Sequence, residues 1–151
     1  MGAIPQVRKH GPKSYPALEA VTGGQLVEGR SGQTGVGVAV DGSVRVAGVA
    51  LNDAVATLVT EPVNGVLDTA PTGTRVLVSS RDEAPVTYAE AAAFGDALVA
   101  AATGQVRPWR ATDPDGAGPL TADTDPRAIV GRCTEPGGVA AGAVGLAFIN
   151  V

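Results

Sequence analysis

Two segments of the chain follow the same pattern, and this duplication limits the possible folds more than any other feature of the sequence. In the first segment, Gly24–Val27 leads to Val46–Asp53, and in the second, Gly95–Val99 leads to Ile129–Glu135. Each segment starts with a glycine shortly before Leu-Val and continues to an aliphatic run that passes through a glycine into a polar turn. The spacing differs between the copies because the second holds an inserted loop at residues 111–125. Self-similarity of this kind indicates a repeated structural scaffold, since neither copy carries a catalytic motif.

The composition favours a β protein with short strands. A chain of 151 residues forms one domain, and with five aromatic residues its core must consist mostly of valine, alanine, leucine and isoleucine. The 21 glycines and 11 prolines would interrupt long helices, whereas valine suits a pleated strand. We therefore expect a mainly β fold: a small sandwich or barrel-like domain of short antiparallel strands.

Alternating valines and turn residues predict individual strands. Val36, Val38 and Val40 precede Asp41-Gly42, and Ser43–Ala50 is the expected return strand of a hairpin. Thr103-Gly104 predicts a second hairpin. Further strands are expected at Pro62–Leu67, Arg75–Ser79, Ala97–Ala101, Gln105–Arg110, Ala128–Cys133 and Ala143–Ile149. The last of these is apolar on both faces, as in a central or closed-barrel strand. The alanine-rich Tyr88–Phe94 is the only place where we expect a short helix.

The charges divide the chain into a basic arm and an acidic body. Met1–Pro16 holds three basic residues and no acidic one, a net charge of +3, whereas the remainder carries −7. Prolines and glycines in this segment predict an extended conformation. We expect an extended arm over residues 1–17 and a single β-rich domain over residues 18–151, from which the loop at 111–125 projects. Such an arm suits an acidic protein surface.

Motifs for catalysis, metal binding and membrane insertion are weak or absent. His10, the only histidine, lies in the arm, and Cys133, the only cysteine, is expected to be a buried strand residue. The loop aspartates Asp113, Asp115, Asp123 and Asp125 do not match an EF-hand. The acid pairs Glu83/Glu90 and Asp82/Asp96 have no supporting motif. We therefore expect no enzyme activity, no cofactor and no metal. The sequence also predicts no nucleic-acid partner, because the body is acidic, and no membrane segment.

The order of several short motifs resembles a known family. The runs Tyr15–Val27, Gly48–Ala54, Gly95–Val106 and Ile129–Arg132 are similar to those of the capsid decoration, or cement, proteins of tailed bacteriophages that infect actinobacteria. The aspartate-rich loop departs from the family's compact pattern. The resemblance implies a non-enzymatic β-rich protein, usually a homotrimer, on the outer surface of the virion capsid.

The resemblance also implies what the chain binds. The partner would be the major capsid protein, at junctions between its subunits, where decoration stabilises the shell against the pressure of packaged DNA. Residues of the arm would lie along the capsid: Val7, Arg8, Lys9, His10, Lys13 and Tyr15. Two alternatives remain open, another structural virion module in the tail or head-completion machinery and a small carbohydrate-binding β module.

Overall fold

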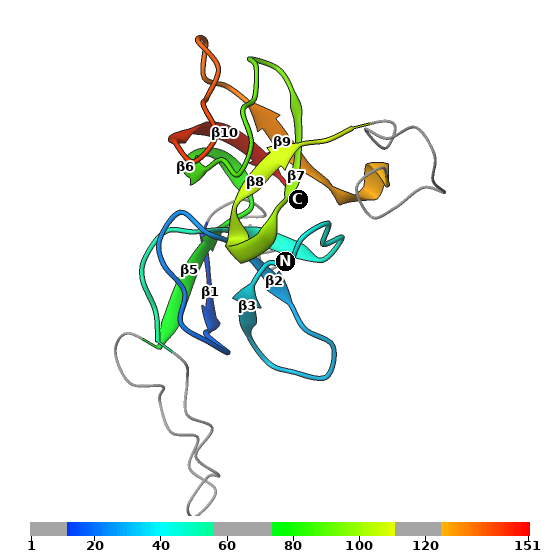
Figure 1. Cartoon of the computed structure of the whole chain (residues 1–151). Coiled ribbons are helices and arrows are strands. Elements are labelled where there is room, and N and C mark those ends of the chain that lie inside the picture. Colours follow the sequence, from blue (N-terminus) through cyan, green and yellow to red (C-terminus); the bar gives the residue numbers. More distant parts are fainter. Residues whose placement is uncertain (1–11, 56–73, 111–124) are drawn as a thin grey trace, which may run out of the picture.

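The computed structural model describes residues 12–55, 74–110 and 125–151, which form two antiparallel sheets of five strands each (Figure 1). The first sheet contains β1 (Lys13–Pro16), β2 (Leu26–Gly29), β3 (Val36–Val38), β4 (Val46–Ala50) and β5 (Arg75–Ser79). The second contains β6 (Arg81–Thr87), β7 (Ala97–Ala100), β8 (Val106–Pro108), β9 (Ile129–Cys133) and β10 (Val144–Asn150). In the described ranges the helical elements are two single 3₁₀ turns, η2 (Ala102–Gly104) and η4 (Pro126–Ala128). The expected mainly β class is confirmed.

The two sheets have the same topology, which confirms the duplication. The first sheet has the order β1-β5-β4-β2-β3 and the second has the order β6-β10-β9-β7-β8, so each strand of the second occupies the place of the strand five positions earlier. In both, the residue after the first strand makes a parallel bridge to the opposite edge, Ala17 to Val36 and Tyr88 to Val106. Each sheet therefore curls until its two edges meet, and we call these units the first repeat (β1–β5) and the second repeat (β6–β10).

A glycine allows close strand contact at the same point of each repeat. The strand register shifts between Val27 and Glu28 in the first repeat and between Leu98 and Val99 in the second. Next to these bulges lie Gly48 and Gly131. A Cβ atom on Gly48 would lie 2.2 Å from the carbonyl oxygen of Ser79, and one on Gly131 would lie 2.1 Å from that of Phe148. No side chain fits at either position, which explains the glycine inside each aliphatic run.

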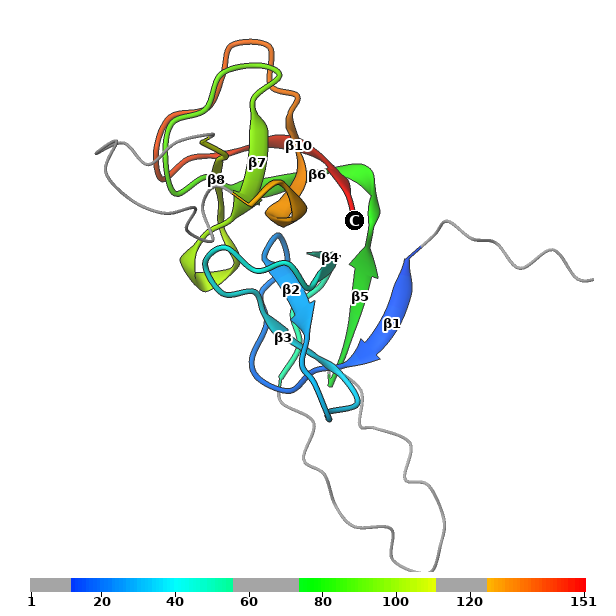
Figure 2. The same ribbon diagram turned by 90° about the vertical axis from the view of Figure 1, so that its right-hand side faces the viewer.

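The repeats are joined by a shared core and by polar contacts. The larger core cluster combines side chains of the second repeat with Leu26, Ala39 and Val49 of the first, while the smaller cluster lies within the first repeat. At their contact, Arg107 Nε donates to Asp41 Oδ1 at 3.0 Å, and the Arg107 side chain is only 9% exposed. The side-by-side arrangement of the two repeats is visible in both views (Figures 1 and 2).

The prediction that the strands on either side of Asp41-Gly42 pair as a hairpin is wrong. A turn does form there, but β2 lies between β3 and β4, so the two strands beside the turn do not pair. Tertiary contacts hold the turn instead: Gly42 N donates to Ala100 O of the second repeat at 2.9 Å, and Asp41 pairs with Arg107. A local turn signal fixes the reversal of the chain but not the strands that pair beyond it.

The helix expected at Tyr88–Phe94 is also wrong. Ala92 exchanges two backbone hydrogen bonds with Val139, at 2.9 and 2.8 Å, and the Tyr88 side chain is fully buried. Tertiary pairing therefore overrides the helix propensity of the alanines.

Most other described strands were expected. The hairpin at Thr103-Gly104 is confirmed by the pairing of β7 with β8, and Cys133 is buried in β9 as expected. β1, β2 and β6 were not predicted. The strand expected at Pro62–Leu67 and nearly all of the loop at 111–125 lie outside the described residues.

The prediction of a central strand at Ala143–Ile149 is confirmed, but one of its apolar faces is exposed. β10 is central, since it pairs with β6 and β9, but Val144, Leu146 and Phe148 on one face are exposed.

Candidate interaction surface

The structure describes only part of the predicted capsid-binding arm. Lys13 and Tyr15 lie in β1, which pairs along its whole length with β5. Lys13 is exposed, whereas Tyr15 is half-buried and packs against the core of the first repeat. The other arm residues, Val7, Arg8, Lys9 and His10, lie outside the described residues. Lys13–Pro16, the last four residues of the basic segment Met1–Pro16, thus form an edge strand of the first sheet.

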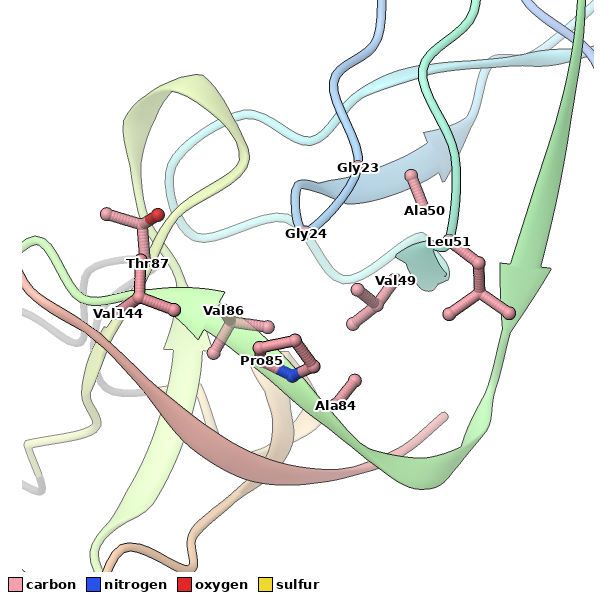
Figure 3. A pocket seen from close by; sticks show the side chains of 10 residues that line it. All are labelled: Gly23, Gly24, Val49, Ala50, Leu51, Ala84, Pro85, Val86, Thr87 and Val144. Carbon is pink, nitrogen blue, oxygen red and sulfur yellow. The ribbon is translucent and has the colours of Figure 1, made fainter.

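One concavity of the described surface lies between the repeats. It has a volume of about 280 Å³ and is lined on one side by Gly23, Gly24 and Val49–Leu51 and on the other by Ala84–Thr87 and Val144. Figure 3 shows the aliphatic side chains that surround it. Its described lining contains no titratable and no aromatic side chain. A carbohydrate site or a catalytic pocket would need such groups, so this cavity favours neither.

The ionisable side chains considered as acid pairs each have a structural partner. Glu83 accepts a hydrogen bond from Thr134 Oγ1 at 2.5 Å, and Glu90 forms an ion pair with Arg110. Asp82 accepts from the backbone N–H of Glu83, and Asp96 accepts from that of Ala93, both at 2.8 Å. These contacts hold turns and strands in place.

The described residues also offer no metal site. Asp125, the one loop aspartate that the structure describes, caps η4 and pairs with Arg127, whose hydrogen bond lowers the pKa of that carboxyl. Within the described ranges no group of three or more His, Cys, Asp or Glu side chains is arranged to hold a metal ion. Nor does any helix in those ranges have the length and apolar character needed to cross a membrane.

The second repeat exposes an unusual row of apolar side chains. On β10, Val144 is 66% exposed, Leu146 is 38% exposed and Phe148 is 43% exposed. Pro85 on β6 is exposed and stands opposite Leu146. These four residues are called the β10 face below. The middle of an antiparallel sheet normally shows polar side chains to water, so this face is a candidate interaction surface.

Two opposite charges flank the β10 face. Phe148 stands opposite Glu83 on β6 and opposite Arg132 on β9, so the three side chains form one row across the sheet. Both charged residues are exposed. Two strand spacings, roughly 10 Å, separate their backbones, and the Glu83 carboxylate bonds to Thr134 Oγ1 rather than to Arg132. Among the described residues Arg132 has no ion-pair partner.

The free sheet edges are poor sites for adding another strand. Three of the four edge strands contain a proline, Pro16 in β1, Pro85 in β6 and Pro108 in β8. Proline has no N–H to donate to a neighbouring strand, and it is a common protection of edges. Association through a face of the sheet is therefore favoured over strand addition.

β6 and the face beside it were missed at the sequence level. The signal was present, since Ala84 and Val86 alternate with Glu83, Pro85 and Thr87. Pro85 argued against a strand at this position, because proline is excluded from the middle of a sheet. It is tolerated in an edge strand such as β6.

Comparison with known proteins gives a structural similarity but no sequence match. No protein-family model and no curated protein sequence matches the chain. Among solved structures, the chain is similar to the crystal structure of the head fiber gp8.5 N base in bacteriophage phi29, with a TM-score of 0.57. The similarity covers 93% of each chain at 18% sequence identity, so it spans both repeats. At this identity the comparison establishes a common fold.

Proposed function

We propose that this chain is a non-enzymatic structural protein of a tailed-phage virion, bound to the outer surface of the assembled capsid. It would bind the major capsid protein at junctions between subunits and stabilise the shell against the pressure of packaged DNA. The observation that carries the proposal is the fold shared, over nearly the whole of both chains, with the base of a phage head fiber. The motif order of the sequence, which resembles decoration proteins of actinobacterial phages, supports the same assignment independently.

The arm is the proposed capsid-binding element. It contains both lysines of the chain, and its charge is opposite to that of the body. Arg8, Lys9 and Lys13 would pair with carboxylates on the capsid, while Val7, His10 and Tyr15 would add contact area. Each arm contributes modestly, but many copies on one particle add up to a large stabilisation of the shell.

The truncation that tests the arm must stop before β1. Removing Met1–Pro16 would also remove the strand that pairs with β5 and would uncover the core at Val76 and Val78. Removing residues 1–12 leaves β1 intact. The test is co-sedimentation with expanded capsids that lack the protein. The full chain should pellet near saturation, and the chain without residues 1–12 should stay in the supernatant.

A charge control separates the contribution of the arm from a general attraction between positive charges of the protein and the capsid. Replacing Arg8, Lys9 and Lys13 by glutamine should weaken capsid binding, more strongly at low salt than at high salt. The control variant removes the same number of positive charges from the body. In it, glutamine replaces three exposed arginines, Arg45, Arg110 and Arg127. Equal loss in both variants would contradict the role of the arm. A full chain that does not pellet at all, or a count of only a few copies per virion, would instead favour a tail or head-completion protein.

A further inference from the structure

The β10 face needs a partner that covers apolar surface in the middle of a sheet. Val144, Leu146 and Phe148 alternate with the buried Gly145, Ala147 and Ile149, so their exposure follows directly from the strand period. Water contact with three large apolar side chains in one row is unfavourable, by roughly 25 cal/mol for each Å² of apolar surface. Homo-oligomers commonly bury such surfaces.

The charges beside the face indicate which partner fits it. When identical chains surround an axis that runs along β10, each chain turns one flank of its sheet toward the opposite flank of the next chain. One flank carries Glu83 and the other carries Arg132, on either side of Phe148. The Glu83 flank also carries Arg81, opposite Asn150, and Glu83 accepts a hydrogen bond from Thr134 Oγ1 of its own chain. Identical copies would bring Glu83 of one chain near Arg132 of the next at every contact around the ring.

We propose that the β10 face is the surface through which copies of this chain associate, with Glu83 of one copy beside Arg132 of the next. Val144, Leu146 and Phe148 fill the centre of the assembly, and Pro85 prevents the neighbouring edge strand from pairing further. The inference rests on the proposed function in one respect: three copies is the number expected for a decoration protein.

The first test compares the same position in the two repeats. Leu146 on β10 and Leu77 on β5 occupy equivalent places, and they are similarly exposed, at 38% and 45%. Light scattering should give three times the chain mass of 14.9 kDa for the unaltered protein and for Leu77→Asp, but the mass of one chain for Leu146→Asp. Thermal unfolding of both variants shows whether each still folds.

The second test exchanges the flanking charges. Glu83→Arg alone and Arg132→Glu alone each place like charges side by side, and each should raise the concentration for half-association by about tenfold or more. The double variant restores opposite charges and should restore association. Rescue by the double variant identifies the contact between Glu83 and Arg132, because a loss of folding would not be repaired by a second charge reversal.

The outcomes separate this inference from the proposed function. A monomeric unaltered protein, an unchanged mass for Leu146→Asp, or a double variant that stays dissociated would overturn the β10 contact. Binding of the same monomeric protein to capsids would leave the proposed function standing. Conversely, an oligomer that behaves as described but does not pellet with capsids would contradict the proposed function and support the contact.

Discussion

The two repeats have the same strand order, yet their outer faces differ. In the first repeat, Asn52 Oδ1 accepts from Leu77 N at 2.7 Å, and Asn52 Nδ2 donates to Arg75 O at 3.1 Å. The Arg75 side chain turns back to Ser14, with Nε 2.8 Å from the hydroxyl oxygen. Leu77 is therefore a single apolar side chain among hydrogen-bonded polar groups, which is ordinary for a surface.

In the second repeat two of the equivalent positions are apolar, since Val144 stands in the place of Arg75 and Pro85 in that of Ser14. The place of Asn52 is taken by Glu135, which accepts from Leu146 N at 3.4 Å. Leu146 occupies the place of Leu77, since Thr134 N donates to Leu146 O just as Leu51 N donates to Leu77 O. Its neighbours on the same face of β10 are Val144 and Phe148, both exposed. The two repeats therefore share a strand order, while the outer face of β10 is more apolar than that of β5.

The cores of the repeats also differ in side-chain size. Ala17 of the first repeat and Tyr88 of the second follow the first strand of their sheets, make equivalent parallel bridges and are both fully buried. Burial raises the pKa of the Tyr88 phenol well above its usual range, so its hydroxyl stays protonated and donates to Leu146 O at 2.9 Å. The second repeat thus depends on a large side chain where the first uses a small one.

The largest expected effect tests whether the glycines at the two bulges are equivalent. Gly48→Ala and Gly131→Ala each place a Cβ about 2 Å from a backbone oxygen, so each should lower the free energy of unfolding by about 3 kcal/mol or more. Gly29→Ala in β2 is the control, because a Cβ there meets nothing within 4 Å. Urea unfolding should show one transition for all three, since the repeats share a core. A tolerated Gly131→Ala beside a destabilising Gly48→Ala would break the equivalence.

The next effect tests the difference in core size. Tyr88→Ala removes a buried ring and should lower the free energy of unfolding by about 3–5 kcal/mol. Tyr88→Phe keeps the ring but removes one of the two donors to Leu146 O, leaving Thr134 N, at a cost of about 1 kcal/mol. Phe94, 65% exposed in the same loop, is the control, and Phe94→Ala should change stability by less than about 0.5 kcal/mol. Comparable losses for Tyr88→Ala and Phe94→Ala would show that the ring at position 88 is not a core element.

The smallest effect tests the turns before β2 and β7. Gln25 Oε1 accepts from Thr22 N and Asp96 Oδ2 accepts from Ala93 N, both at 2.8 Å and both three residues apart. Gln25→Ala and Asp96→Ala should therefore each cost about 1 kcal/mol in chemical denaturation. Asp96→Asn keeps an acceptor oxygen and should be close to neutral. A difference of more than about 1 kcal/mol between the two alanine variants would mean that the turns are not equivalent.

The candidate surface was only partly accessible to sequence reasoning. The apolar pattern of Ala143–Ile149 predicted a central strand, which β10 is, but it did not indicate that one face is exposed. Exposure depends on what lies above the sheet, and local periodicity carries no information about that. Glu83 and Arg132 lie far apart in the sequence, and only the pairing of β6, β10 and β9 brings them to either side of Phe148.

By itself the sequence determined the β class, most strand positions and the duplication, because valine alternation and glycine spacing act through local backbone geometry. Only the tertiary structure decided which strands pair. It placed β2 between β3 and β4, turned the alanine-rich Tyr88–Phe94 into a bridged loop, and made Lys13–Pro16 an edge strand. These outcomes depend on contacts between residues far apart in the chain, whose energies exceed the local preferences of each segment.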